Sequence, residues 1–111
     1  MAYDEGLAQR VRTVLRRRQG FAEKKMFGGV GFLLRGNMCV GVWKEWLIVR
    51  LGPDMGESAL REPHVRPFDI TGRAMRGWAM IAPEGLEDDN ELKRWIRAAA
   101  EFVAELPAKH A

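Results

Sequence analysis

The chain has 111 residues, of which 47% are hydrophobic and 30% are charged, so we expect a single folded domain over residues 1–111. No apolar run approaches the roughly 18 residues of a membrane span, and the start of the chain lacks a signal peptide. These features predict a soluble, cytoplasmic protein with no membrane partner. The net charge is +3, but residues 1–52 hold ten Lys/Arg against four Asp/Glu, whereas residues 53–111 hold eight against eleven. The basic first half gives weak support for an anionic partner such as nucleic acid.

The first predicted element is a helix over Asp4–Arg18. Leu7, Val11 and Leu15 recur at the spacing of one helix face. Asp4 stands where an N-cap is expected, and the arginines at the other end complement the helix dipole before Gly20 ends the helix.

Short strands follow this helix. The two-residue separations Gly36-Asn37 and Lys44-Glu45 predict tight hairpins, and therefore an antiparallel meander. The predicted strands are Glu23–Phe27, Val30–Leu34, Met38–Trp43 and Trp46–Leu51.

The expected register places apolar residues on both faces of this meander. With two-residue turns at both places, Leu33 pairs with Val40 and Val40 pairs with Val49, which defines a core face. The opposite face is also apolar, and its candidate interface residues are Phe32, Trp43, Trp46 and Ile48. Because large exposed apolar patches mark interaction sites, this face predicts a protein partner or self-association, for example as a dimer.

The second half of the chain adds helices and one more strand. We expect a short helix over Met55–Arg61, an irregular segment between Pro63 and Pro67, and a strand over Trp78–Ala82. Asp88 and Glu91 form a capping box before an amphipathic helix that Pro107 closes. The prediction is a two-layer α+β fold, in which an antiparallel sheet of about five strands with a central β-meander packs with an N-terminal and a C-terminal helix.

Residue types that carry catalysis or bind metals are sparse. A single cysteine, Cys39, and two histidines, His64 and His110, make no recognisable zinc set. Cys39 lies within a predicted strand, so a structural role is favoured over a nucleophile assisted by His64 and Asp69. The glycines of segment 28–31 precede a strand rather than a helix, which favours a bend over a phosphate-binding loop. We therefore expect no enzyme activity, no metal and no cofactor.

Two groups of polar residues are candidates for binding. Lys24 and Lys25, beside Phe27, combine charge with an aromatic ring as single-stranded nucleic-acid binders do. The second group could hold a small anion or a substrate if its side chains converge on one pocket, although a turn closed by Asp69 and Arg73 would also explain it. Its members are His64, Arg66, Asp69, Arg73 and Arg76.

Several motifs together resemble one known family. The block from Lys24 to Phe32 (KKMFGGVGF), the following Gly36-Asn37-Met38 hairpin, Pro83-Glu84-Gly85-Leu86 and the helix that bears Trp95 are similar to the N-terminal domain of the TfoX/Sxy family. The resemblance covers nearly the whole chain and implies an antiparallel sheet with flanking helices. The family is named for bacterial competence regulators that also carry a C-terminal domain, whereas the segment 62–73 resembles that of stand-alone, single-domain members. The resemblance implies a noncatalytic interaction or regulatory domain and carries over no catalytic residue.

Overall fold

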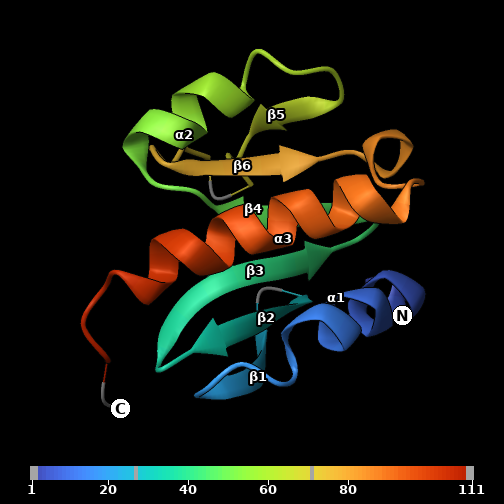
Figure 1. The fold of residues 1–111 in the computed structure, drawn as a ribbon. Coiled ribbons are helices and arrows are strands. Elements are labelled where there is room, and N and C mark those ends of the chain that lie inside the picture. Colours follow the sequence, from blue (N-terminus) through green and yellow to red (C-terminus); the bar gives the residue numbers. More distant parts are fainter. Residues whose placement is uncertain (1–2, 27, 71, 110–111) are drawn as a thin grey trace.

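Six strands form one antiparallel sheet in the computed structural model, which describes residues 3–26, 28–70 and 72–109 (Figure 1). The strand order across the sheet is β1-β2-β3-β4-β6-β5. The strands are β1 (Phe21–Met26), β2 (Gly29–Leu34), β3 (Asn37–Trp43), β4 (Trp46–Arg50), β5 (Val65–Pro67) and β6 (Trp78–Ile81). This arrangement confirms the predicted α+β fold, with one strand more than the five expected.

The additional strand is β5, where the sequence predicted an irregular segment. Val65–Pro67 pairs with β6, with Arg66 opposite Met80. Two prolines argued against a strand here, but β5 lies at the edge of the sheet, where the missing N–H of Pro67 removes no ladder hydrogen bond.

Helices α1 (Glu5–Leu15) and α3 (Asp89–Ala104) lie side by side on one face of the sheet (Figure 1). Both predicted N-caps are confirmed, because Asp4 accepts a hydrogen bond from the Leu7 N–H at 3.0 Å and Asp88 accepts one from the Asn90 N–H at 2.7 Å. Glu91, expected to complete a capping box, instead accepts a hydrogen bond from Arg94. The short helix α2 (Pro53–Ala59) connects β4 to β5, and the 3-10 turn η1 (Pro83–Gly85) lies between β6 and α3. None of the helices described is long and apolar enough to cross a membrane.

The turn between β2 and β3 differs from the prediction by one residue. Arg35 and Gly36 occupy the two turn positions with φ angles of 51° and 81°, and Asn37 already pairs with Leu34 in the ladder. The side chain of Asn37 donates a hydrogen bond to the carbonyl of Pro107 at 2.9 Å, so its polar group is used in tertiary packing rather than in the turn.

This shift, together with a β-bulge, makes the predicted register of β2 wrong. Phe32, rather than Leu33, pairs with Val40, whereas Val40 pairs with Val49 as expected. Since a shift of one residue exchanges the two faces of a strand, Phe32 lies under the helices and is 0% exposed. Phe32 is therefore a core residue and not part of an exposed interface.

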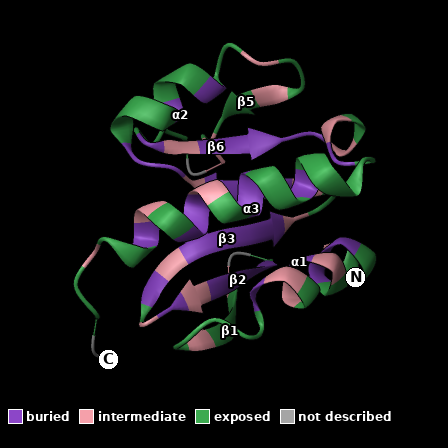
Figure 2. Ribbon diagram, in the orientation of Figure 1, coloured by how far each residue is buried: buried purple, intermediate pink, exposed green. Residues whose placement is uncertain are grey.

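The helix-covered face of the sheet holds the core. Figure 2 shows β3 and β6 as mostly buried, while the outer surfaces of α1 and α3 are exposed. Large side chains buried there include Leu15, Phe32, Leu47, Ile81, Leu92 and Ile96. Arg35 attaches the β2–β3 hairpin to the end of α3. Its guanidinium donates hydrogen bonds to the carbonyls of Ala104 at 2.7 Å and Leu106 at 3.1 Å.

The opposite face of the sheet is covered only in part, by the segment between β5 and β6. Phe68 packs on Trp78 with ring centroids 5.5 Å apart, and the Met75 N–H donates a hydrogen bond to the Phe68 carbonyl at 3.0 Å. The chain therefore covers part of its own second apolar face and leaves the remainder accessible.

Candidate functional site

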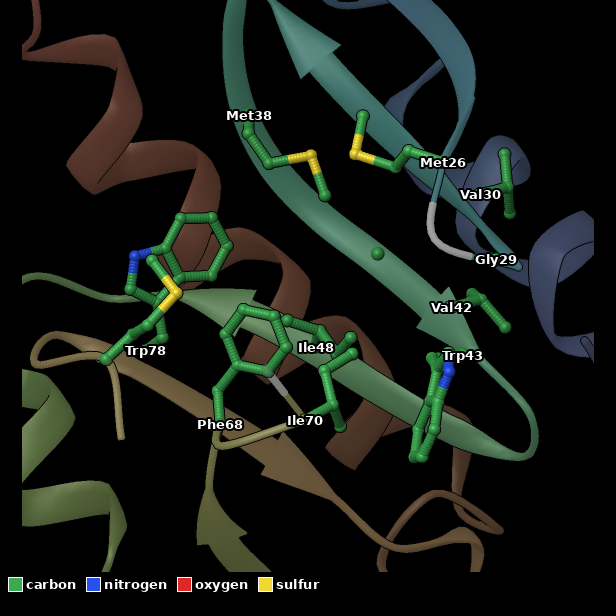
Figure 3. Close-up of a pocket in the computed structure, with 12 residues that line it drawn as sticks. Met26, Gly29, Val30, Met38, Val42, Trp43, Ile48, Phe68, Ile70 and Trp78 are labelled. Atoms are coloured by element: carbon green, nitrogen blue, oxygen red, sulfur yellow. The ribbon is translucent and has the colours of Figure 1, made fainter. Parts of the chain in front are cut away.

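An apolar groove of about 290 Å³ lies on the sheet face away from α1 and α3 (Figure 3). Met26 and Met38 stand on one side of it, Phe68 and Ile70 stand on the other, and Ile48 lies between them. The remaining residues that line the groove are Gly29, Val30, Gly41, Val42, Trp43, Met75 and Trp78. The groove is thus lined by hydrocarbon, thioether and indole groups.

Two paired glycines make room for the methionine side chains of the groove wall. Gly31 on β2 is paired with Gly41 on β3, so two neighbouring strands present bare backbone at this point. A Cβ atom on Gly31 would come within 2.7 Å of the Met38 sulfur, and one on Gly41 would come within 3.1 Å of the Met38 Cε. The methionine side chains lie over the positions that larger residues would otherwise fill.

Methionines give this groove an adaptable wall. Met26 and Met38 approach each other over Gly31, with their thioether ends directed toward one another (Figure 3). Met75, 40% exposed, contributes from the covering segment. Because methionine is unbranched and has a polarizable sulfur, such a wall can adjust to apolar groups of different shape.

Three of the four predicted interface residues lie at this site. Trp43 and Ile48 line the groove, and Trp46 pairs directly with Trp43 across β3 and β4, as expected. Ile48 is 5% exposed and forms part of the floor, while both tryptophans are half-buried. The fourth residue, Phe32, lies on the other face of the sheet.

The five candidate residues of the second half do not converge on one pocket. His64 lies in a separate cleft beside Glu84 and Arg94, whereas the guanidinium of Arg66 lies 5.9 Å from the centre of the Trp46 ring. Asp69, Arg73 and Arg76 are exposed. The convergence that a small-anion site at these residues would require is therefore not seen.

The predicted structural explanation for this segment is only half right. The Gly72 N–H donates a hydrogen bond to the Asp69 carbonyl at 2.9 Å, which closes a turn. The expected contact between Asp69 and Arg73 is not among the ion pairs of the described residues.

Lys24 and Lys25 are exposed on β1 and point to opposite faces of the sheet. Lys24 pairs with Gly31 and lies on the groove face, while Lys25 pairs with Val30 and lies on the helix face. Phe27, the aromatic residue expected beside them, lies outside the described residues. The two lysines therefore do not act as one basic cluster.

Cys39 is buried in the core, as its position within a strand predicted. Burial raises the pKa of its thiol to about 12, because ionisation would place a charge among apolar side chains. His64 lies in a cleft away from the core, so the Cys39–His64–Asp69 arrangement is not assembled. The described residues contain no cluster of His, Cys, Asp and Glu able to hold a metal ion.

Half of the residues that line the groove were not predicted from the sequence. Met26, Met38, Phe68, Ile70, Met75 and Trp78 were not considered as site residues. The sequence signal for the groove was the presence of Gly31 and Gly41 in neighbouring strands, each preceded by a methionine, Met26 or Met38. Its interpretation required the correct pairing of β2 with β3.

Comparison with known proteins identifies one family. Residues 13–103 match the family model described as the TfoX N-terminal domain. The chain matches no curated protein and no solved structure.

Proposed function

The chain belongs to the TfoX N-terminal domain family, and we propose that it is a noncatalytic interaction domain that binds a protein partner through the apolar groove. The observation that carries this proposal is the groove itself. A concave, apolar surface bounded by tryptophans and methionines suits the burial of a partner's apolar side chains.

The composition of the groove supports binding rather than chemistry. Its lining side chains offer thioether, aliphatic and aromatic groups, with the indole N–H groups as their polar atoms. General acid–base catalysis and nucleophilic catalysis both need titratable groups within hydrogen-bond reach of a substrate. Cys39, the one thiol in the sequence, is buried on the other face of the sheet.

The rigid parts of the groove also favour binding. Its floor is built on β2, β3 and β4, which are paired on both sides and packed under α3. A site held by paired strands loses little freedom when a ligand binds, whereas the methionine side chains and the segment around Phe68 can adjust.

The experiment that tests this proposal is selection of displayed random peptides on the folded domain, followed by binding measurements with Gly41→Val. The valine would stand under the Met38 methyl group and fill the groove floor. Ala22→Val, on the exposed part of β1, is the matched control.

Peptides that bind the native domain and Ala22→Val, but not Gly41→Val, would support the proposal. Selection of no peptide, or equal binding to both variants, would contradict it. Sedimentation of the domain alone shows in parallel whether a second copy occupies the groove.

A further inference from the structure

Some cations on the helix-covered side of the molecule form ion pairs with carboxylates. The Nη2 atom of Arg10 lies 2.8 Å from a carboxylate oxygen of Asp89. The Nη2 atom of Arg94 lies 2.8 Å from carboxylate oxygens of both Glu62 and Glu91. Hydrogen bonds to Glu91 and Glu62 raise the pKa of Arg94 above its ordinary value. The charges of Arg10 and Arg94 are therefore compensated within the fold, whereas other exposed cations of this layer, such as Arg17 and Arg97, take part in none of the ion pairs of the described residues.

Three cations around the groove also lie over indole rings, as Arg94 does over Trp95, but they differ from Arg94 in their ion pairing. The Nζ atom of Lys44 lies 4.7 Å from the centre of the Trp43 ring. The Cζ atoms of Arg50 and Arg66 lie 5.5 Å and 5.9 Å from the ring centres of Trp78 and Trp46, respectively. Within the described ranges of the chain, none of these three cations takes part in an ion pair. Since a cation keeps its full charge on an aromatic face, all three can still bind an anion.

Lys24 adds a fourth cation to the same face. It is exposed and pairs with Gly31, which in turn pairs with Gly41 in the groove floor. A symmetric dimer through this face would bring the cations of two copies together, and like charges at an interface oppose association. The charge pattern therefore favours a different partner over a second copy of this chain.

The cations lie at both ends of the groove. Lys44 is beside Trp43 at one end, and Arg50 is beside Trp78 at the other. Along β4 the distance from Trp46 to Arg50 is about 13 Å, at ~3.3 Å per residue. An occupant that reaches both ends is elongated, apolar in the middle and anionic on both sides.

From this arrangement we infer that the groove binds an acidic segment of another protein, in which carboxylates flank one or two large apolar side chains. The inference rests on the proposed function and specifies its partner. The apolar side chains lie between Met38 and Phe68, and the flanking carboxylates reach Lys44 at one end and Arg50 at the other. About four extended residues span the distance between these two cations.

A nucleic-acid strand would also be attracted to these cations, but it fits the groove less well. Strands bound without sequence preference stack their bases on open aromatic faces. Here Trp43, Trp46 and Trp78 each have a cation on one face and are only partly exposed. Glycine backbone and the Ile48 side chain form the floor, which suits aliphatic groups better than base edges.

The test uses the native domain and fluorescein-labelled probes in an anisotropy titration. One short peptide has Leu-Phe-Leu flanked on both sides by Asp and Glu, a second replaces every acid by Lys, and a third replaces Leu and Phe by Ser. An oligothymidylate of similar length is the nucleic-acid probe. Each titration is made at low and at near-physiological salt.

We expect the acidic apolar peptide to bind about tenfold or more tightly than the other three probes. Equal or tighter binding of the lysine peptide, of the serine peptide or of oligothymidylate would overturn the inference, as would binding of no probe. If the peptides selected by display bind in the groove but are basic or uncharged, the proposed function stands and only this inference fails.

Charge reversal provides the second measurement. The double variant Lys24→Glu, Lys44→Glu changes two exposed side chains and should weaken binding of the acidic peptide by about fivefold or more. Its matched control, Arg17→Glu with Arg97→Glu, makes the same charge change on exposed residues outside the groove. Equal weakening by both double variants would mean that only net charge matters, and would overturn the inference.

Discussion

Gly31 and Gly41 are paired directly across β2 and β3, which leaves two adjacent strands without side chains beneath the methionines of the groove. Either glycine in isolation would weaken its strand, since glycine is poorly suited to a strand interior. Their pairing places both gaps at one point on the second face of the sheet, where Met26 and Met38 lie over Gly31 and Gly41 lines the groove.

Gly41→Val should fill the groove without unfolding the domain. The new Cβ would lie 3.1 Å from the Met38 Cε, which is the far end of a flexible side chain, and valine suits a strand better than glycine does. We expect an unchanged or slightly higher melting temperature together with loss of binding of the neutral apolar dye Nile red. Unaltered dye binding would show that the dye, and hence the apolar binding site, lies elsewhere.

Trp95→Ala should strongly destabilise the domain. Trp95 is 4% exposed and belongs to the core between α3 and the sheet. Its truncation leaves a large cavity, which costs about 3–5 kcal/mol. Urea denaturation measures the change, with Arg97→Ala on the exposed face of the same helix as the control. A loss below about 1 kcal/mol would place Trp95 outside the core.

Arg35→Ala should weaken the attachment of the β2–β3 hairpin to α3. The change removes the hydrogen bonds from Arg35 to the Ala104 and Leu106 carbonyls, at a cost of about 1–2 kcal/mol. Arg35→Gly loses the same bonds but relieves the left-handed backbone, whose φ is 51°. We therefore expect the glycine variant to be more stable than the alanine variant in chemical denaturation, and the reverse order would contradict this account of the turn.

Cys39 should be unreactive in the folded domain. Burial raises the pKa of its thiol from 9.0 to about 12, so the reactive thiolate is almost absent at pH 8. We expect a thiol reagent such as DTNB to modify Cys39 only after unfolding in guanidinium. Rapid modification of the native protein would contradict the burial of this side chain.

The same pKa predicts how Cys39 affects stability at alkaline pH. Above pH 9 the unfolded chain loses the thiol proton while the folded chain keeps it, so unfolding becomes progressively easier up to about pH 12. Below pH 9 both states hold the proton and the thiol has no effect on pH dependence. Cys39→Ala should therefore lose less stability than the native protein between pH 8 and pH 10.5 in thermal melts.

Local sequence signals predicted most of the fold. Asp4 and Asp88 precede the two main helices as N-caps, and the Lys44-Glu45 turn sets the pairing of Trp43 with Trp46. These features depend on residues close in sequence. β5 was missed because its pairing with β6 is formed by tertiary structure, against the usual effect of proline in a strand.

The groove was less accessible to sequence reasoning because it depends on register. Asn37 has turn-forming chemistry, yet its side chain bonds to the Pro107 carbonyl, a contact between residues far apart in the chain. The resulting one-residue error exchanged the faces of β2, so Phe32 was placed at the interface and Gly31 was overlooked. The segment containing Phe68 and Met75 returns over the sheet through contacts that no short-range pattern encodes.

The most direct test of the groove as the binding site is a methyl NMR titration of the methionine-labelled domain with the acidic apolar peptide. Met26, Met38 and Met75 line the groove, while Met55 lies on α2, is 52% exposed and does not line it. We expect large shifts of the three groove methyl signals and no shift of the Met55 signal. Binding that moves the Met55 signal, or that leaves the groove signals in place, would contradict it.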